Sequence, residues 1–62
     1  MDWYVIAADM PDGKTYIGIT TDEFIDEVNI IAGPFSEDEA DRQVVVLARQ
    51  RNLPEFKEYR QL

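Results

Sequence analysis

Two short segments in the first third of the chain would, as extended strands, direct their side chains alternately to two faces. Residues 3–8 (WYVIAA) and 15–20 (TYIGIT) are rich in β-branched and aromatic residues, which is typical of β-strands. Pro11, Asp12 and Gly13 stand between them, and this triplet favours a tight turn because Pro presets φ and Gly accepts a positive φ. The pattern therefore predicts an antiparallel β-hairpin.

The register of this hairpin decides which side chains share a face. If Asp9 lies opposite Lys14, one face carries Tyr4, Ile6, Ile17 and Ile19, and the other carries Trp3, Val5 and Tyr16. Both faces are then partly apolar. We expect one of them to cover the core and the other to need a helix, a second chain or a ligand.

A third strand is predicted further along the chain. Residues 21–27 are mostly polar, so we expect either a loop or a single helical turn there. Residues 28–32 (VNIIA) have strand character, and we expect this strand to stop at Gly33 and Pro34, because Pro cannot donate to a β-ladder.

Helical signals follow at Ser36. Ser36 and Glu39 have the spacing of a capping box. Apolar residues then recur at helical spacing, namely Ala40, Val44, Leu47 and Ala48. Asn52 is a suitable C-terminal stop, with Pro54 beyond it. A helix over residues 37–51 is therefore predicted.

The end of the chain has a different apolar repeat. Every third residue is apolar at Leu53, Phe56, Tyr59 and Leu62. A short helix that begins at Pro54 would place them on one stripe. We expect this stripe either to close the core or to bind a partner.

These elements predict an α+β fold in a single small domain, residues 1–62. Its sheet has three antiparallel strands, formed by the hairpin and the third strand, and it packs against one helix, with a short C-terminal helix as a further option. A chain of this length buries only about 60% of its unfolded surface. We expect one thin core that includes Ile6, Ile17 and Leu47.

Composition removes most catalytic chemistry. The 62 residues include no cysteine and no histidine, so thiol nucleophiles, Cys/His zinc sites and the usual neutral-pH base are missing. The spacing of the carboxylates matches no calcium loop, and no phosphate-binding glycine loop occurs. We therefore expect a protein that is not an enzyme, with no catalytic residue, no metal and no cofactor.

The charge balance sets the class of partner. Thirteen acidic residues against six basic ones give a formal charge of −7, which repels nucleic acid and anionic membranes. The acidity can serve solubility alone, or it can imitate nucleic-acid phosphate. The residues available for such mimicry are Asp22, Glu23, Asp26, Glu27, Glu37, Asp38, Glu39 and Asp41.

The cellular compartment is also an expectation from sequence. The first residues lack the basic and long apolar regions of a signal peptide, and no stretch reaches the ~20 apolar residues of a membrane span. We expect a cytoplasmic protein that contacts no membrane.

One stretch resembles a known family. Gly33, Pro34, Phe35, Ala40 and Leu47 stand where the half-repeat of SPOR domains has a strand ending in Gly-x-Phe followed by a helix with an early Ala. SPOR domains are peptidoglycan-binding modules, so the resemblance implies glycan binding. It covers residues 30–47. The chain departs from the family by having the Pro-Asp-Gly hairpin in place of a first unit.

The function expected from the residues is that of a non-catalytic regulator, of the kind encoded as a small accessory or phage protein, that docks on a larger macromolecule. Its expected partner-binding residues are Trp3, Val5, Tyr16, Phe56 and Tyr59. A homodimer that buries the uncovered face is a competing expectation. The alternatives are an acidic inhibitor that mimics nucleic acid and a SPOR-like glycan-binding module.

Overall fold

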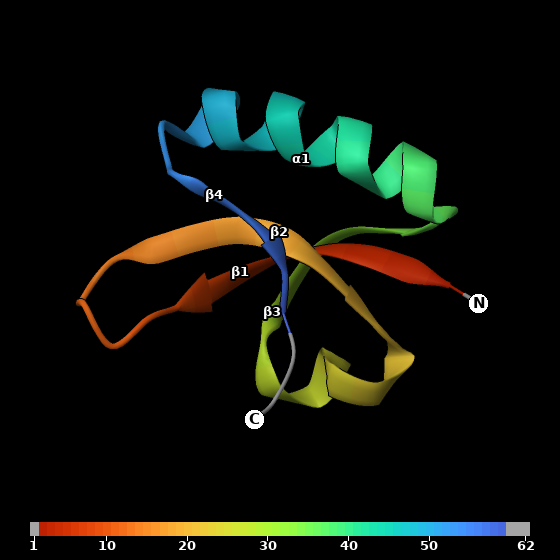
Figure 1. Cartoon of the computed structure of the whole chain (residues 1–62), viewed down its shortest axis with the longest axis horizontal. Coiled ribbons are helices and arrows are strands. Elements are labelled where there is room, and N and C mark those ends of the chain that lie inside the picture. Colours follow the sequence, from red (N-terminus) through yellow and green to blue (C-terminus); the bar gives the residue numbers. More distant parts are fainter. Residues whose placement is uncertain (1, 60–62) are drawn as a thin grey trace.

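The computed structural model describes residues 2–59 and contains one four-stranded sheet and two helices. In chain order the elements are β1 (Trp3–Asp9), β2 (Thr15–Thr21), the 3-10 helix η1 (Asp22–Glu27), β3 (Asn29–Phe35), α1 (Glu37–Arg51) and β4 (Glu55–Glu58). The strand order is β3-β1-β2-β4. α1 lies along one face of the sheet, and η1 lies on the other side of the strands (Figure 1). The α+β class is confirmed, but the sheet is mixed and has a fourth strand.

The hairpin is confirmed, and its register differs from the expected one. The Met10 amide donates to the Lys14 carbonyl at 2.8 Å, and the Gly13 amide donates to the Met10 carbonyl at 2.9 Å. The loop therefore has three residues instead of four, with Gly13 at φ +84°, as is common in hairpins of this length. As a result Asp9 lies opposite Thr15 instead of Lys14.

This shift by one residue changes the membership of each face. Val5 lies opposite Ile19, and Ala7 lies opposite Ile17. Tyr4 and Ile6 therefore do not share a face with Ile17 and Ile19, and that expectation is wrong, because side chains alternate with a period of two. The face toward α1 instead forms the core, whose buried members are Val5, Ile17, Ile19, Ala40, Val44 and Ala48.

α1 has the predicted bounds, and a capping interaction is present at each of its two ends. The Ser36 hydroxyl accepts a hydrogen bond from the Glu39 amide at 3.2 Å, which satisfies one free donor of the first turn. At the other end Asn52 is left-handed (φ 55°, ψ 46°). Its amide donates to the Arg49 carbonyl, and the Leu53 amide donates to the Ala48 carbonyl. This pair of bonds is a Schellman motif.

The third strand continues past its expected end. β3 pairs antiparallel with β1, with Ile30 opposite Ile6 but Ala32 opposite Val5. The extra residue turns both Ile31 and Ala32 toward the core, as in a β-bulge. Gly33 (φ +124°) then lets the strand pass close to β1, since a Cβ there would lie 3.0 Å from the Trp3 carbonyl oxygen.

Residues Glu55–Glu58 form a strand, so the short C-terminal helix considered as an option is not formed there. β4 runs parallel to β2, with Glu55 opposite Ile17 and Glu58 opposite Ile19. Backbone bonds from Ile17 to the Pro54 carbonyl and from Tyr59 to the Ile19 carbonyl hold its two ends, at 2.9 and 2.8 Å. Three residues of β4 thus match two of β2. That irregularity places Phe56 and Tyr59 together, whereas Leu53 packs against the core on the side of α1, and Leu62 lies outside the described residues.

The sheet face away from α1 is covered by the chain itself. Ile6 and Thr20 on this face are 0% exposed. The Phe56 ring lies over Gly18, where an added Cβ would come within 2.5 Å of the ring. The expected uncovered apolar face is therefore absent from residues 2–59, because η1 (Figure 1) and the Phe56 ring of β4 lie over it.

Gly18→Ala should destabilise the protein by about 1–3 kcal/mol, because the new methyl group would displace the Phe56 ring. Without that contact, Gly to Ala in a strand would be neutral or stabilising. Thermal unfolding of Gly18→Ala, Phe56→Leu and the double variant measures this. In the double variant Gly18→Ala should cost less than it does beside Phe56. An unchanged melting temperature for Gly18→Ala would contradict the packing of Phe56 in β4 against Gly18.

Candidate partner-binding surface

The five expected partner-binding residues lie on two different faces. Val5 is 0% exposed, so it cannot contact a partner in the folded protein, and Trp3 packs against the core beneath α1. Tyr16, Phe56 and Tyr59 lie together on the opposite face, half-buried. The hairpin register separates the two groups.

The aromatic residues of the second face form a continuous cluster. Ring centroids are 6.4 Å apart for Tyr16 and Phe56, 6.5 Å for Phe56 and Tyr59, and 6.2 Å for Phe24 and Tyr59, all with edge-to-face geometry. Phe24 comes from η1 and was missed as a partner of this group because its neighbours in sequence are polar. Since this cluster covers Gly18 and the middle strands, its first role is to close the fold.

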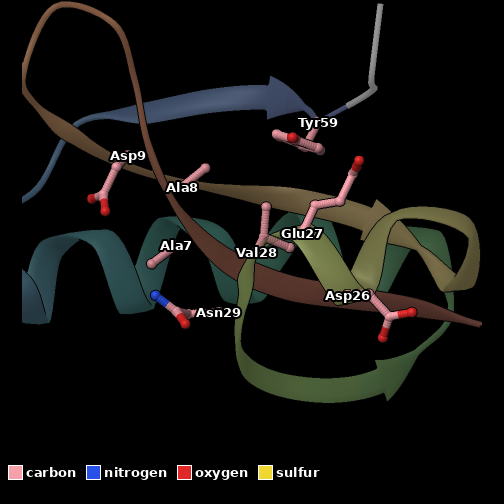
Figure 2. A pocket seen from close by; sticks show the side chains of 8 residues that line it. All are labelled: Ala7, Ala8, Asp9, Asp26, Glu27, Val28, Asn29 and Tyr59. Carbon is pink, nitrogen blue, oxygen red and sulfur yellow. The ribbon is translucent and has the colours of Figure 1, made fainter.

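A shallow cavity of about 240 Å³ adjoins the aromatic cluster at Tyr59. Figure 2 shows the eight side chains that line it: Ala7, Ala8, Asp9, Asp26, Glu27, Val28, Asn29 and Tyr59. The side chain of Glu27 extends toward Tyr59, whereas those of Asp9 and Asp26 lie on opposite sides of the view. Within residues 2–59 no group of three or more acidic side chains is placed to hold a metal ion.

The eight acidic residues proposed for nucleic-acid mimicry do not share one surface. Asp22, Glu23, Asp26 and Glu27 belong to η1, on one side of the sheet, while the first turns of α1 carry Glu37, Asp38, Glu39 and Asp41 on the other side (Figure 1). All except Glu39 are exposed. Glu39 accepts hydrogen bonds from Arg42 and Gln43 at 3.2 and 3.0 Å. The two groups instead lie at the two ends of β3, which connects them.

β3 is an edge strand, and its outer side is open. Within residues 2–59 it pairs only with β1. We call residues Asn29–Ala32 the open edge. Ile30 within it is 47% exposed, one of two large apolar side chains with that exposure in the described part of the chain. An open edge presents unpaired N–H and C=O groups that can pair with another chain.

The other edge of the sheet is protected. β4 has only four residues, and its exposed Glu55 and Lys57 are charged. It also follows Pro54 directly. Short length and charge are the usual means by which proteins prevent pairing at an edge, so the two edges of this sheet differ in their capacity to accept a strand.

Comparison with known proteins finds no matching family model, no matching curated protein and no matching solved structure. The SPOR resemblance of residues 30–47 therefore stays a prediction. Neither helix in the described part of the chain is long and apolar enough to span a membrane.

The hairpin turn contains a hydrogen-bonded pair with perturbed titration. The Tyr16 hydroxyl donates to the Asp12 carboxylate at 2.6 Å, and the Lys14 amide donates to the same side chain at 2.9 Å. The bond from Tyr16 lowers the pKa of Asp12 below its ordinary 3.8, with help from the Lys14 amide. The same bond raises the pKa of Tyr16 above 10.0.

This pair predicts a pH dependence of stability. Asp12 binds fewer protons in the folded state, so its stabilising effect is present above pH 3.8 and is lost as the pH falls through its lower folded pKa. Tyr16 keeps its effect below pH 10.0 and loses it as the pH rises through its folded pKa. In Tyr16→Phe, the NMR titration midpoint of Asp12 should move up toward 3.8. A midpoint that does not move would show that the hydroxyl bond is not formed.

Proposed function

We propose that this protein is a non-catalytic binding module that docks on a larger protein by accepting an extended segment along the open edge of β3. The observation that supports the proposal is the contrast between the two sheet edges. β4 is short and charged, whereas the open edge is uncharged and exposes Ile30. Strand addition of this kind gains affinity from main-chain hydrogen bonds and specificity from alternate side chains.

The sequence around the open edge supports the same proposal. Residues 28–35 (VNIIAGPF) carry no charge, although charged residues make up 31% of the chain. A row of charged side chains would have protected this edge. Its absence leaves the backbone of Asn29–Ala32 accessible to a second strand.

The length of the docking site is limited at both ends. Pro34 has no N–H to donate, and Gly33 at φ +124° departs from regular strand geometry. Before Asn29 the chain forms η1, which ends at Glu27. The partner segment therefore pairs with about four residues, which span roughly 13 Å.

The covering of both sheet faces favours docking at an edge of the sheet over docking on a face. In the described residues 2–59 the two faces of the sheet are covered by α1 and by the aromatic cluster with η1, so neither offers the large apolar patch that a docking face needs. An edge, in contrast, can accept a partner without exposing the core. Docking at an edge therefore suits a domain of 62 residues, whose core is thin.

Ile30→Lys should abolish this docking without unfolding the protein, because a lysine on an exposed edge strand opposes strand addition. Val46→Lys is the matched control, since Val46 on α1 has the same 47% exposure and the substitution adds the same charge. Peptides selected from a random displayed library for binding to the unsubstituted protein supply the ligand. They should bind Val46→Lys normally and Ile30→Lys at least about tenfold more weakly.

Selected peptides that bind Ile30→Lys and Val46→Lys equally well would place the docking site elsewhere and contradict the proposal. Equal melting temperatures of the two variants verify that any loss of binding comes from the edge and not from unfolding.

A further inference from the structure

We infer, on the basis of the proposed function, that the segment docked on the open edge belongs to another protein and carries Lys or Arg at both ends of a neutral centre. The inference follows from the charges at the two ends of β3. The first acidic flank consists of Asp22, Glu23, Asp26 and Glu27, and the second consists of Glu37, Asp38, Glu39 and Asp41.

Within residues 2–59, a basic residue compensates only one carboxylate of these flanks. Residues 15–41 contain eight acidic side chains and no Lys or Arg. Seven of the eight are exposed, and among residues 2–59 only Glu39 has an ion-pair partner, Arg42 at 3.2 Å. The open edge is thus an uncharged strip between two negative ends.

This arrangement selects the partner by charge complementarity. β3 lies between the end of η1 at Glu27 and the start of α1 at Glu37, so a strand that pairs with Asn29–Ala32 and extends along β3 in both directions approaches both flanks. Side chains beyond its centre then lie near carboxylates at both ends. Nine residues, 28–36, separate the two flanks, so at about 3.3 Å per residue the two basic ends are separated by roughly nine neutral residues.

The same charges oppose a second copy of this chain as the occupant. If two copies paired edge to edge in antiparallel fashion, the first flank of each copy would approach the second flank of the other. Each copy also carries a formal charge of −7. Like charges across a contact lower affinity, so self-pairing through β3 is disfavoured where a basic segment is favoured.

The test compares two synthetic peptides. Both have a centre of about nine alternating Val and Thr residues. One has a pair of lysines at each end, and the other has serines in those places. Calorimetry gives the affinities, and amide chemical shifts of Asn29–Ala32 identify the site. The lysine peptide should bind at least about tenfold more tightly, and raising NaCl to about 0.5 M should remove most of that difference.

Charge-neutral variants identify the carboxylates responsible. The double variant Glu27→Gln/Glu37→Gln removes one exposed carboxylate from each flank, and Glu55→Gln is the control, an exposed glutamate on the opposite edge. The double variant should weaken the lysine peptide about threefold or more, whereas Glu55→Gln should leave it unchanged.

The outcomes separate this inference from the proposed function. If the serine peptide binds the same residues as tightly as the lysine peptide, the charge selection is overturned while docking on the edge stands. If neither peptide shifts the amides of Asn29–Ala32, the proposed function fails and the inference with it. Sedimentation that shows a dimer disrupted by Ile30→Lys would make a second copy the occupant and overturn the inference.

Discussion

The three-residue turn of the β-hairpin fixes which side chains form the core. Gly13 accepts the positive φ that this turn requires, and Asp12 fixes the loop by accepting from Lys14 and Tyr16. The resulting register directs Val5, Ile17 and Ile19 toward α1. A turn longer by one residue would move one of the two strands by half a period and separate these residues onto different faces. The whole core therefore depends on a turn that lies outside it.

The same register explains why a glycine lies in the middle of a central strand. Gly18 is directed to the face away from α1, where the Phe56 ring occupies the space of a side chain. This contact brings β4 alongside β2 and lets the sheet have a second covered face. A thin domain thus gains a further layer from the four aromatic rings of this cluster, where larger proteins would use a helix.

The structure confirms the predicted features that depend on residues close together in the sequence. It differs from the prediction where segments distant in the sequence pair with each other. α1 was predictable to the residue because a Ser36 cap and an Asn52 stop act within one turn of the helix. β4 was not, because a parallel strand depends on partners nearly 40 residues away, such as Thr20 and Tyr59. Of the candidate site, the sequence indicated the acidic residues and the aromatic ones. It did not indicate that β3 forms an edge, because strand order depends on the whole sheet.

The position of β3 follows from how α1 must cross the sheet. β3 and β4 lie at opposite edges, and α1 connects them, so the helix covers the two central strands. Each edge strand must therefore prevent pairing with other chains through its own residues. β4 does so with charge and short length. β3 cannot place charges at Ile31 and Ala32, because its bulge turns both toward the core. The carboxylates of this region are therefore confined to the residues before and after the strand, where they flank an open backbone instead of blocking it.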